Sequence, residues 1–90
     1  MTAILQGEVA LVTGASRGIG AAIADELAAQ GATVIGTATT ESGAHAIAER
    51  LSAQGGAGRI LDVTAAGTIA ALLESIATQF GPISVLVNNA

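Results

Sequence analysis

The amino-acid sequence predicts an α/β fold built on a parallel sheet, with the element order β-α-β-α-β-α-β. Three observations support this prediction. Short apolar runs alternate with segments whose apolar residues recur at helical spacing. Glycine, alone or next to proline, separates most of these segments. Each of the first three expected strands is followed by a segment of helical length, which is the connection that neighbouring parallel strands require.

The first two strand and helix pairs are marked by glycine and by apolar spacing. The first strand is expected at Val9–Thr13 and the first helix at Ile19–Gln30, followed by Gly31, a residue type that suits the position after a helix. A second strand is expected at Thr33–Thr37. The second helix is indicated by apolar residues at positions i, i+3, i+4 and i+7, namely Ala44, Ile47, Ala48 and Leu51.

The second half of the chain repeats this pattern. A Gly-Gly-Ala-Gly stretch at residues 55–58 ends the second helix, and a third strand is expected at Arg59–Val63. Thr64 is a candidate N-cap for a third helix with a continuous apolar face. Gly81-Pro82 ends that helix, and Ile83–Val87 forms the fourth strand. Right-handed crossovers then give the strand order 3-2-1-4 of a Rossmann-type sheet.

Composition excludes several classes of function. The chain has 90 residues and a net charge of −4, and its three cationic side chains are arginines, which argues against a nucleic-acid surface. No apolar run reaches the ~18 residues of a membrane span, and the first residues lack the positive region of a secretory signal. The absence of cysteine excludes disulfides and thiolate chemistry. We therefore expect a cytoplasmic protein with no metal site.

Catalytic residue types are also scarce. The chain contains no lysine and no tyrosine, and its one histidine is His45, which we expect on the exposed side of a helix. Many arrangements of a general base or a nucleophile are thereby ruled out.

The segment between the first strand and the first helix carries the strongest indication of function. Residues 13–20 read Thr-Gly-Ala-Ser-Arg-Gly-Ile-Gly and lead directly into a helix. Such a turn directs backbone N–H groups and a helix N-terminus toward one point, where a dinucleotide pyrophosphate can bind. Gly14 permits the tight turn, Gly18 lets a phosphate approach the backbone, and Gly20 lets the helix pack closely. The spacing is G-x-x-x-G-x-G rather than G-x-G-x-x-G, and a purely structural turn is the alternative.

The end of the second strand bears on which dinucleotide is bound. Sites that prefer NAD usually carry Asp or Glu there, whereas residues 34–40 contain no carboxylate. Glu41 follows Gly20 at about the spacing of that acidic residue, but we expect it in the first turn of the second helix. Arg17 is suited to a forked contact with a 2′-phosphate, and Thr39 to a hydroxyl contact. These residues favour NADP, with a solvated loop arginine as the alternative interpretation of Arg17.

Two further positions follow strands at the same edge of the sheet. Asp62 either accepts a hydrogen bond from an adenine amino group or caps the third helix. Asn88 and Asn89 follow the fourth strand, next to the first, at the switch point where open α/β sheets bind ligands. Their side chains either contact a cofactor or bridge the backbones of the strands.

Together these residues resemble the short-chain dehydrogenase/reductase family. Residues 13–20 match its cofactor motif, and Asn88-Asn89-Ala90 matches the first three letters of its Asn-Asn-Ala-Gly motif. Residues 34–44 resemble, more particularly, the bacterial 3-oxoacyl-[acyl-carrier-protein] reductases, which use NADPH in fatty-acid synthesis. The resemblance covers essentially the whole sequence.

The resemblance implies a role for individual residues in binding NADP(H). The glycine-rich loop would hold the phosphates, Thr39 the end that carries the 2′-phosphate, and Asn89 the ribose region. Asp62 and Val63 would contact the adenine. The expected cofactor-binding residues are Gly14, Ala15, Ser16, Arg17, Gly18, Ile19, Gly20, Thr39, Asp62, Val63 and Asn89.

The resemblance also implies parts that this sequence does not contain. The catalytic Ser, Tyr and Lys of the family follow the Asn-Asn-Ala-Gly motif, whereas the sequence stops at Ala90. Residues 1–90 are therefore expected to be the N-terminal, dinucleotide-binding portion of one truncated Rossmann domain, inactive alone. The complete enzyme would reduce substrates linked to acyl carrier protein and form a homo-oligomer. The alternatives are another short-chain ketone reductase and a non-catalytic dinucleotide-binding or assembly module.

Overall fold

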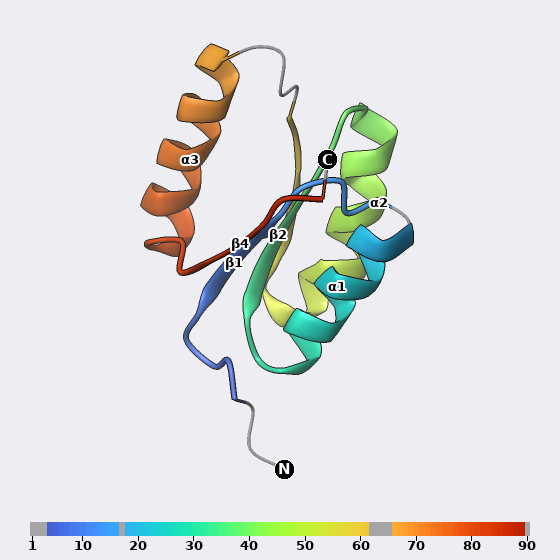
Figure 1. The fold of residues 1–90 in the computed structure, drawn as a ribbon, viewed down its shortest axis with the longest axis vertical. Coiled ribbons are helices and arrows are strands. Elements are labelled where there is room, and N and C mark those ends of the chain that lie inside the picture. Colours follow the sequence, from blue (N-terminus) through green and yellow to red (C-terminus); the bar gives the residue numbers. More distant parts are fainter. Residues whose placement is uncertain (1–3, 17, 62–65, 90) are drawn as a thin grey trace.

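The computed structural model describes residues 4–16, 18–61 and 66–89. Strands and helices alternate along the chain as the sequence predicts (Figure 1). Their order and bounds are β1 (Val9–Val12), α1 (Gly18–Ala29), β2 (Thr33–Ala38), α2 (Glu41–Leu51), a short 3₁₀ turn η1 (Ser52–Gln54), β3 (Ala57–Ile60), α3 (Ala66–Phe80) and β4 (Val85–Val87).

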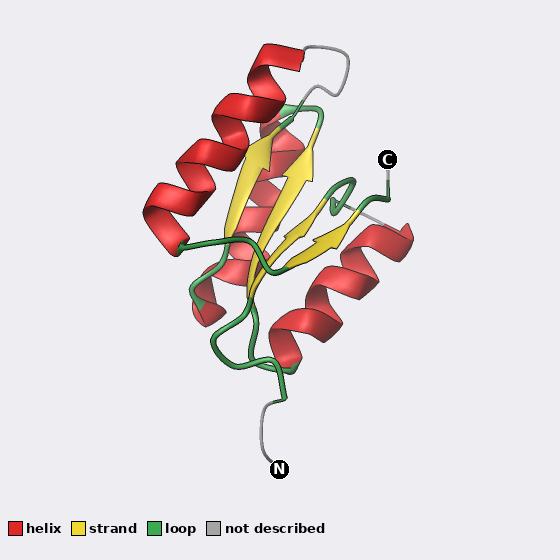
Figure 2. Ribbon diagram, turned by 60° about the vertical axis from the view of Figure 1, so that its left-hand side comes forward, coloured by secondary structure: helices red, strands yellow, loops and turns green. Residues whose placement is uncertain are grey.

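The strands form one parallel sheet in the order β3-β2-β1-β4, which confirms the predicted order. Leu11 in the central strand β1 pairs with Ile35 of β2 and with Leu86 of β4. Helices α1 and α2 cover one face of the sheet and α3 covers the other, as Figures 1 and 2 show. The Rossmann-type architecture predicted from the sequence is therefore present.

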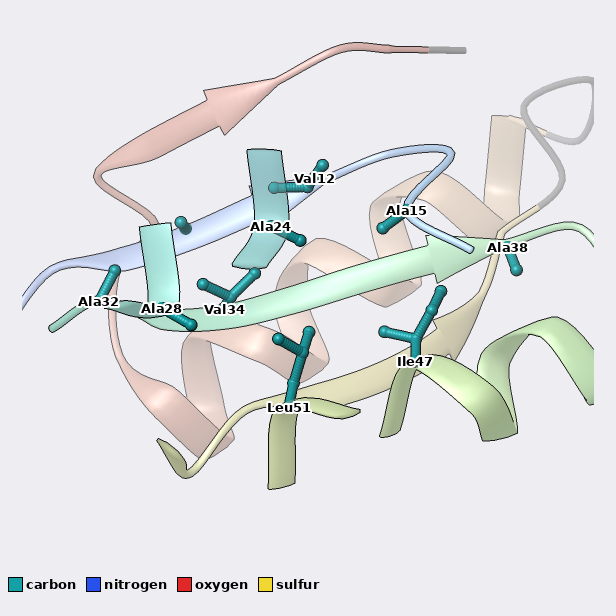
Figure 3. Packing of buried hydrophobic residues seen from close by; sticks show 10 residues of the cluster. Val12, Ala15, Ala24, Ala28, Ala32, Val34, Ala38, Ile47 and Leu51 are labelled. Carbon is teal, nitrogen blue, oxygen red and sulfur yellow. The ribbon is translucent and has the colours of Figure 1, made fainter. Parts of the chain in front are cut away.

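The core is divided between the two faces of the sheet, because alternate residues of a strand point to opposite sides. On the side of α1 and α2, the core is built mainly from small residues, several of which Figure 3 displays. The buried face of α1 consists of Gly20, Ala24 and Ala28, so this helix lies close to the sheet. On the other side, Ile76 of α3 packs with a cluster that includes Ile35. The close packing of α1 fixes the position of the loop that precedes it.

Several element limits differ from the prediction, most clearly at β3. This strand begins at Ala57, two residues earlier than expected, and ends at Ile60. A side chain at Gly58 would overlap the carbonyl oxygen of Ala44 in α2. Glycine is therefore required here by the close approach of α2 to β3, and it lies inside the strand rather than before it.

The other differences amount to one or two residues. β1 ends one residue early, at Val12, and β2 extends one residue further, to Ala38. β4 begins at Val85 rather than Ile83, because Ser84 joins β1 partly through its side chain: Val9 N donates to Ser84 Oγ at 3.1 Å, and Ser84 N donates to Val9 O at 2.9 Å. The predicted N-cap Thr64 lies outside the described residues.

Candidate functional site

The glycine-rich loop between β1 and α1 has the backbone conformation that its glycines predict. Gly14 and Gly18 have φ angles of +64° and +66°, in the left-handed region that favours glycine. A side chain at Gly20 would overlap the carbonyl oxygen of Gly14 and come within 2.6 Å of Asn89 Nδ2. Glycine at position 20 therefore lets the first turn of α1 lie directly against the loop.

Ala15 anchors this loop to the body of the protein. Its N–H donates to the carbonyl oxygen of Thr37 in β2 at 2.9 Å, and its carbonyl oxygen accepts from Arg50 Nη1 at 3.2 Å. Its side chain is fully buried, and its methyl group would be only 2.8 Å from a Cβ atom at Gly36. Both backbone polar groups of Ala15 are thus engaged within the protein, which leaves the neighbouring Ser16 at the exposed part of the loop.

The end of β4 is joined to the loop through the buried Thr13. The Thr13 N–H donates to the carbonyl oxygen of Val87 at 3.0 Å, and its hydroxyl lies 3.2 Å from Asn88 Oδ1, to which it donates. The same hydroxyl accepts from Asn89 N at 2.9 Å, while Asn89 Nδ2 donates to the carbonyl oxygen of Gly14 at 3.4 Å. Asn89 therefore lies beside the loop, and its side chain makes the backbone-bridging contact that was one of its two expected roles.

Two adjoining cavities open beside the loop, at the carboxyl ends of the strands. They have volumes of about 260 Å³ and about 380 Å³, and both are lined by Ser16, Ala38 and Thr39. The smaller cavity is completed by Thr13, Gly14, Thr37 and Leu61. The larger one is completed by Thr40, Ser42, Gly43 and Ala46. This location is where open α/β sheets bind their ligands, and the lining is rich in hydroxyl groups and glycine.

Among the residues that the structure describes, no carboxylate lines either cavity. Glu41 lies in the first turn of α2, as predicted, and borders a separate surface hollow with Ser42 and His45. Thr40 caps the same helix, because its Oγ1 accepts from Gly43 N at 3.1 Å. His45 is exposed, as predicted, and lies 3.1 Å from Glu49. The edge of β2 thus presents hydroxyl groups rather than an acid.

The structure brings together part of the set of cofactor-binding residues expected from the sequence. Gly14, Ser16 and Thr39 line the cavities, whereas Ile19 is 72% exposed on the first turn of α1. Arg17, Asp62, Val63 and Ala90 lie outside the described residues.

Sequence reasoning did not single out Thr37, Ser42, Leu61 or Arg50 as neighbours of the site. Hydroxyl-bearing residues recur through positions 37–42, and this pattern was a usable indication for the first two. The sequence held no such indication for Arg50, because this residue lies 35 positions from Ala15 and only tertiary packing brings the two together.

The described parts of the chain lack two kinds of feature. They contain no cluster of His, Cys, Asp and Glu suited to a metal ion. They also contain no helix with the length and apolar character needed to cross a membrane.

Comparison with known proteins is consistent with this geometry. A family model described as short chain dehydrogenase matches residues 8–90. The chain is 58% identical over 85 residues to the 3-oxoacyl-[acyl-carrier-protein] reductase FabG of Escherichia coli, covering 94% of this chain and 34% of that protein. It is 60% identical over 88 residues to the protein of the same name from Pseudomonas aeruginosa, covering 96% of this chain and 36% of that one. The chain therefore spans about a third of the length of these relatives.

Proposed function

Because this chain belongs to the short-chain dehydrogenase family, we propose that it is the NADPH-binding portion of a 3-oxoacyl-[acyl-carrier-protein] reductase. The two relatives described above carry that name, are more than half identical to this chain and align with nearly its whole length. The observation that carries the proposal is the hydroxyl-lined pair of cavities next to the glycine-rich loop.

The loop fits the phosphates of a dinucleotide. Gly14 and Gly18 have left-handed backbone conformations, and α1 begins at Gly18 with its N-terminus at the loop. Such an N-terminus presents unpaired N–H groups and a partial positive charge to an anion. Ser16 and Gly18 would hold the pyrophosphate, with Arg17 between them in the sequence.

The larger cavity fits the 2′-phosphate that distinguishes NADP from NAD. The hydroxyl-bearing residues Thr39 and Ser42 line it, and the described part of its lining holds no carboxylate that would repel a phosphate. Arg17 would supply the positive charge. Asp62 and Val63 would contact the adenine, and Asn89 would border the ribose.

The reaction would belong to the whole protein. When bound, NADPH supplies a hydride, and in a 3-oxoacyl reductase the acceptor is the C3 ketone of a thioester linked to acyl carrier protein. The 90 residues contribute binding and orientation of the cofactor, since they include no tyrosine or lysine to deliver a proton to the resulting alkoxide. A homo-oligomeric assembly is part of the same proposal.

Titration calorimetry with NADP⁺ and NAD⁺ tests the proposal. We expect NADP⁺ to bind more tightly than NAD⁺. Arg17→Ala should reduce the ratio of the two affinities by roughly 10- to 100-fold, as expected for a lost charge-assisted contact. If the two dinucleotides bind with equal affinity, and Arg17→Ala changes neither affinity, the proposal of a 2′-phosphate site is wrong.

Thr39→Asp tests the same site from the opposite direction. An acid at the exposed end of β2 repels the 2′-phosphate and is suited to the ribose hydroxyls of NAD, so the preference should shift toward NAD⁺. Thr78→Asp is the matched control, because Thr78 is an exposed threonine on α3, which covers the other face of the sheet. An equal shift in both variants would show that the change in net charge, rather than the site, is responsible.

A further inference from the structure

Arg50 joins three points of the structure that lie far apart in the sequence. It lies in the last turn of α2, and its guanidinium reaches across to α1 and to the loop before α1. Nη1 donates to the carbonyl oxygen of Ala15 at 3.2 Å, and Nη2 donates to the carbonyl oxygen of Ala21 at 3.1 Å and to Asp25 Oδ1 at 2.6 Å. The hydrogen bond to Ala15 is partly buried, whereas the contacts with Ala21 and Asp25 are open to water.

The contact with Ala15 is placed where it controls the shape of the loop. The N–H of Ala15 is fixed to Thr37 O on β2, and the methyl group is packed in the core. The guanidinium fixes the remaining polar group of this residue, its carbonyl oxygen. The three contacts hold the peptide units on both sides of Ala15, and the second of these leads directly to Ser16.

We infer that Arg50 is a positioning residue for the dinucleotide site: it holds the glycine-rich loop in the shape that receives the pyrophosphate. Within the described residues, its hydrogen bonds go to Ala15, Ala21 and Asp25, none of which lines the two cavities, so it acts through Ala15. The ligand part of this inference rests on the proposed function, whereas the effect on the loop does not.

Asp25 forms an ion pair with Arg50. Its carboxylate pairs with the guanidinium at 2.6 Å and offsets the positive charge. The contribution of Arg50 to the site is therefore geometric, because a planar guanidinium can donate to two carbonyl groups and a carboxylate at once. Replacement by methionine keeps most of the apolar stem and removes every donor.

Amide hydrogen exchange of the full chain tests the effect on the loop without any ligand. In Arg50→Met we expect the Ala15 amide to exchange roughly 3- to 10-fold faster, as lost hydrogen bonds of ordinary strength would allow, while amides of β1 stay within about twofold. Asp25→Asn should leave the exchange rate of the Ala15 amide within about twofold of the unmodified protein. The asparagine oxygen can still accept from the Arg50 guanidinium, and the contact of Arg50 with Ala15 O is kept. Unchanged exchange at Ala15, or equal acceleration along the whole of β1, would overturn the inference.

Binding measurements on the same variants test the link to the ligand. Arg50→Met should weaken NADP⁺ and NAD⁺ by the same factor, roughly 3- to 10-fold, because the pyrophosphate is common to both. Arg59→Met is the control, because it removes the same positive charge. It should change neither the affinity for NADP⁺ nor that for NAD⁺, since Arg59 donates to Gln79 Oε1 of α3 and to Gly58 O. Faster exchange at Ala15 with unchanged affinities would overturn the positioning role. Failure of the unmodified chain to bind either dinucleotide would contradict the proposed function, and the exchange result would still decide whether Arg50 holds the loop.

Discussion

The backbone N–H of Asn89 donates a hydrogen bond of 2.9 Å to the hydroxyl of Thr13, which lies 76 positions earlier in the chain. The same hydroxyl lies within 3.2 Å of Asn88 Oδ1. Because Thr13 is buried at the end of the central strand, this one hydroxyl fixes the end of β4 against the start of the glycine-rich loop. Strand pairing and the shape of the candidate site thus share a residue.

Thr13→Val should therefore destabilise the fold, although valine fits the space. The change removes the acceptor for Asn89 N and the hydroxyl that donates to Asn88 Oδ1, at a cost of about 0.5–1.5 kcal/mol, because water can reach both exposed asparagines. Chemical denaturation measures the loss in the free energy of unfolding. Thr78→Val, at an exposed position of α3, is the control and should change it by less than about 0.5 kcal/mol. Equal stability of the two variants would mean that the Thr13 hydroxyl contributes little.

Gly20→Ala should also destabilise the protein, opposite in sign to the usual effect. Glycine to alanine inside a helix normally stabilises by about 0.5–1 kcal/mol. Here the added methyl group would overlap the carbonyl oxygen of Gly14, so we expect a net loss of about 1–3 kcal/mol or a displaced loop. Thermal unfolding measures the sign of the change. An increase in melting temperature would show that α1 can move away from the loop at no cost.

The 90-residue polypeptide should not reduce acetoacetyl thioesters with NADPH above background. It contains no tyrosine or lysine to protonate the alkoxide, even if it binds the cofactor. Loss of NADPH absorbance, followed with highly purified protein, measures the activity. Steady consumption of NADPH in the absence of any longer reductase would contradict this prediction.

The same polypeptide should self-associate through β4. Within the described chain, β4 has a hydrogen-bonded neighbour on one side, β1, and its Leu86 is 65% exposed. An apolar strand edge is a template for pairing with another chain. Leu86→Lys should shift sedimentation toward the monomer, and it is a cleaner test than Val85→Lys, because Val85 packs against the core.

Ile60→Lys is the control for this experiment, since Ile60 is 51% exposed on β3 at the opposite edge of the sheet. A shift toward monomer in Ile60→Lys alone would place the contact at β3. If the polypeptide without substitutions sediments as a single monomeric species, neither edge of the sheet pairs with another chain.

The order and type of the elements could be predicted from the sequence because both depend on local patterns. Apolar spacing identified the helices, and the apolar runs between glycines identified the strands. The start of β3 could not be found in this way. Gly58 reads locally as a break, yet it lies within the strand because the carbonyl oxygen of Ala44 occupies the space of its side chain.

The candidate site divides along the same line. The sequence by itself determined the glycine-rich loop, since left-handed turns favour glycine. It also determined the hydroxyl-bearing, carboxylate-free end of β2, since this property depends only on which residue types follow one another there. Only the tertiary structure decided how the loop is held. Thr37 and Arg50 reach Ala15 because β2 pairs with β1 and because α1 and α2 share one face of the sheet. Contacts between residues so distant in sequence arise from packing, which local spacing does not encode.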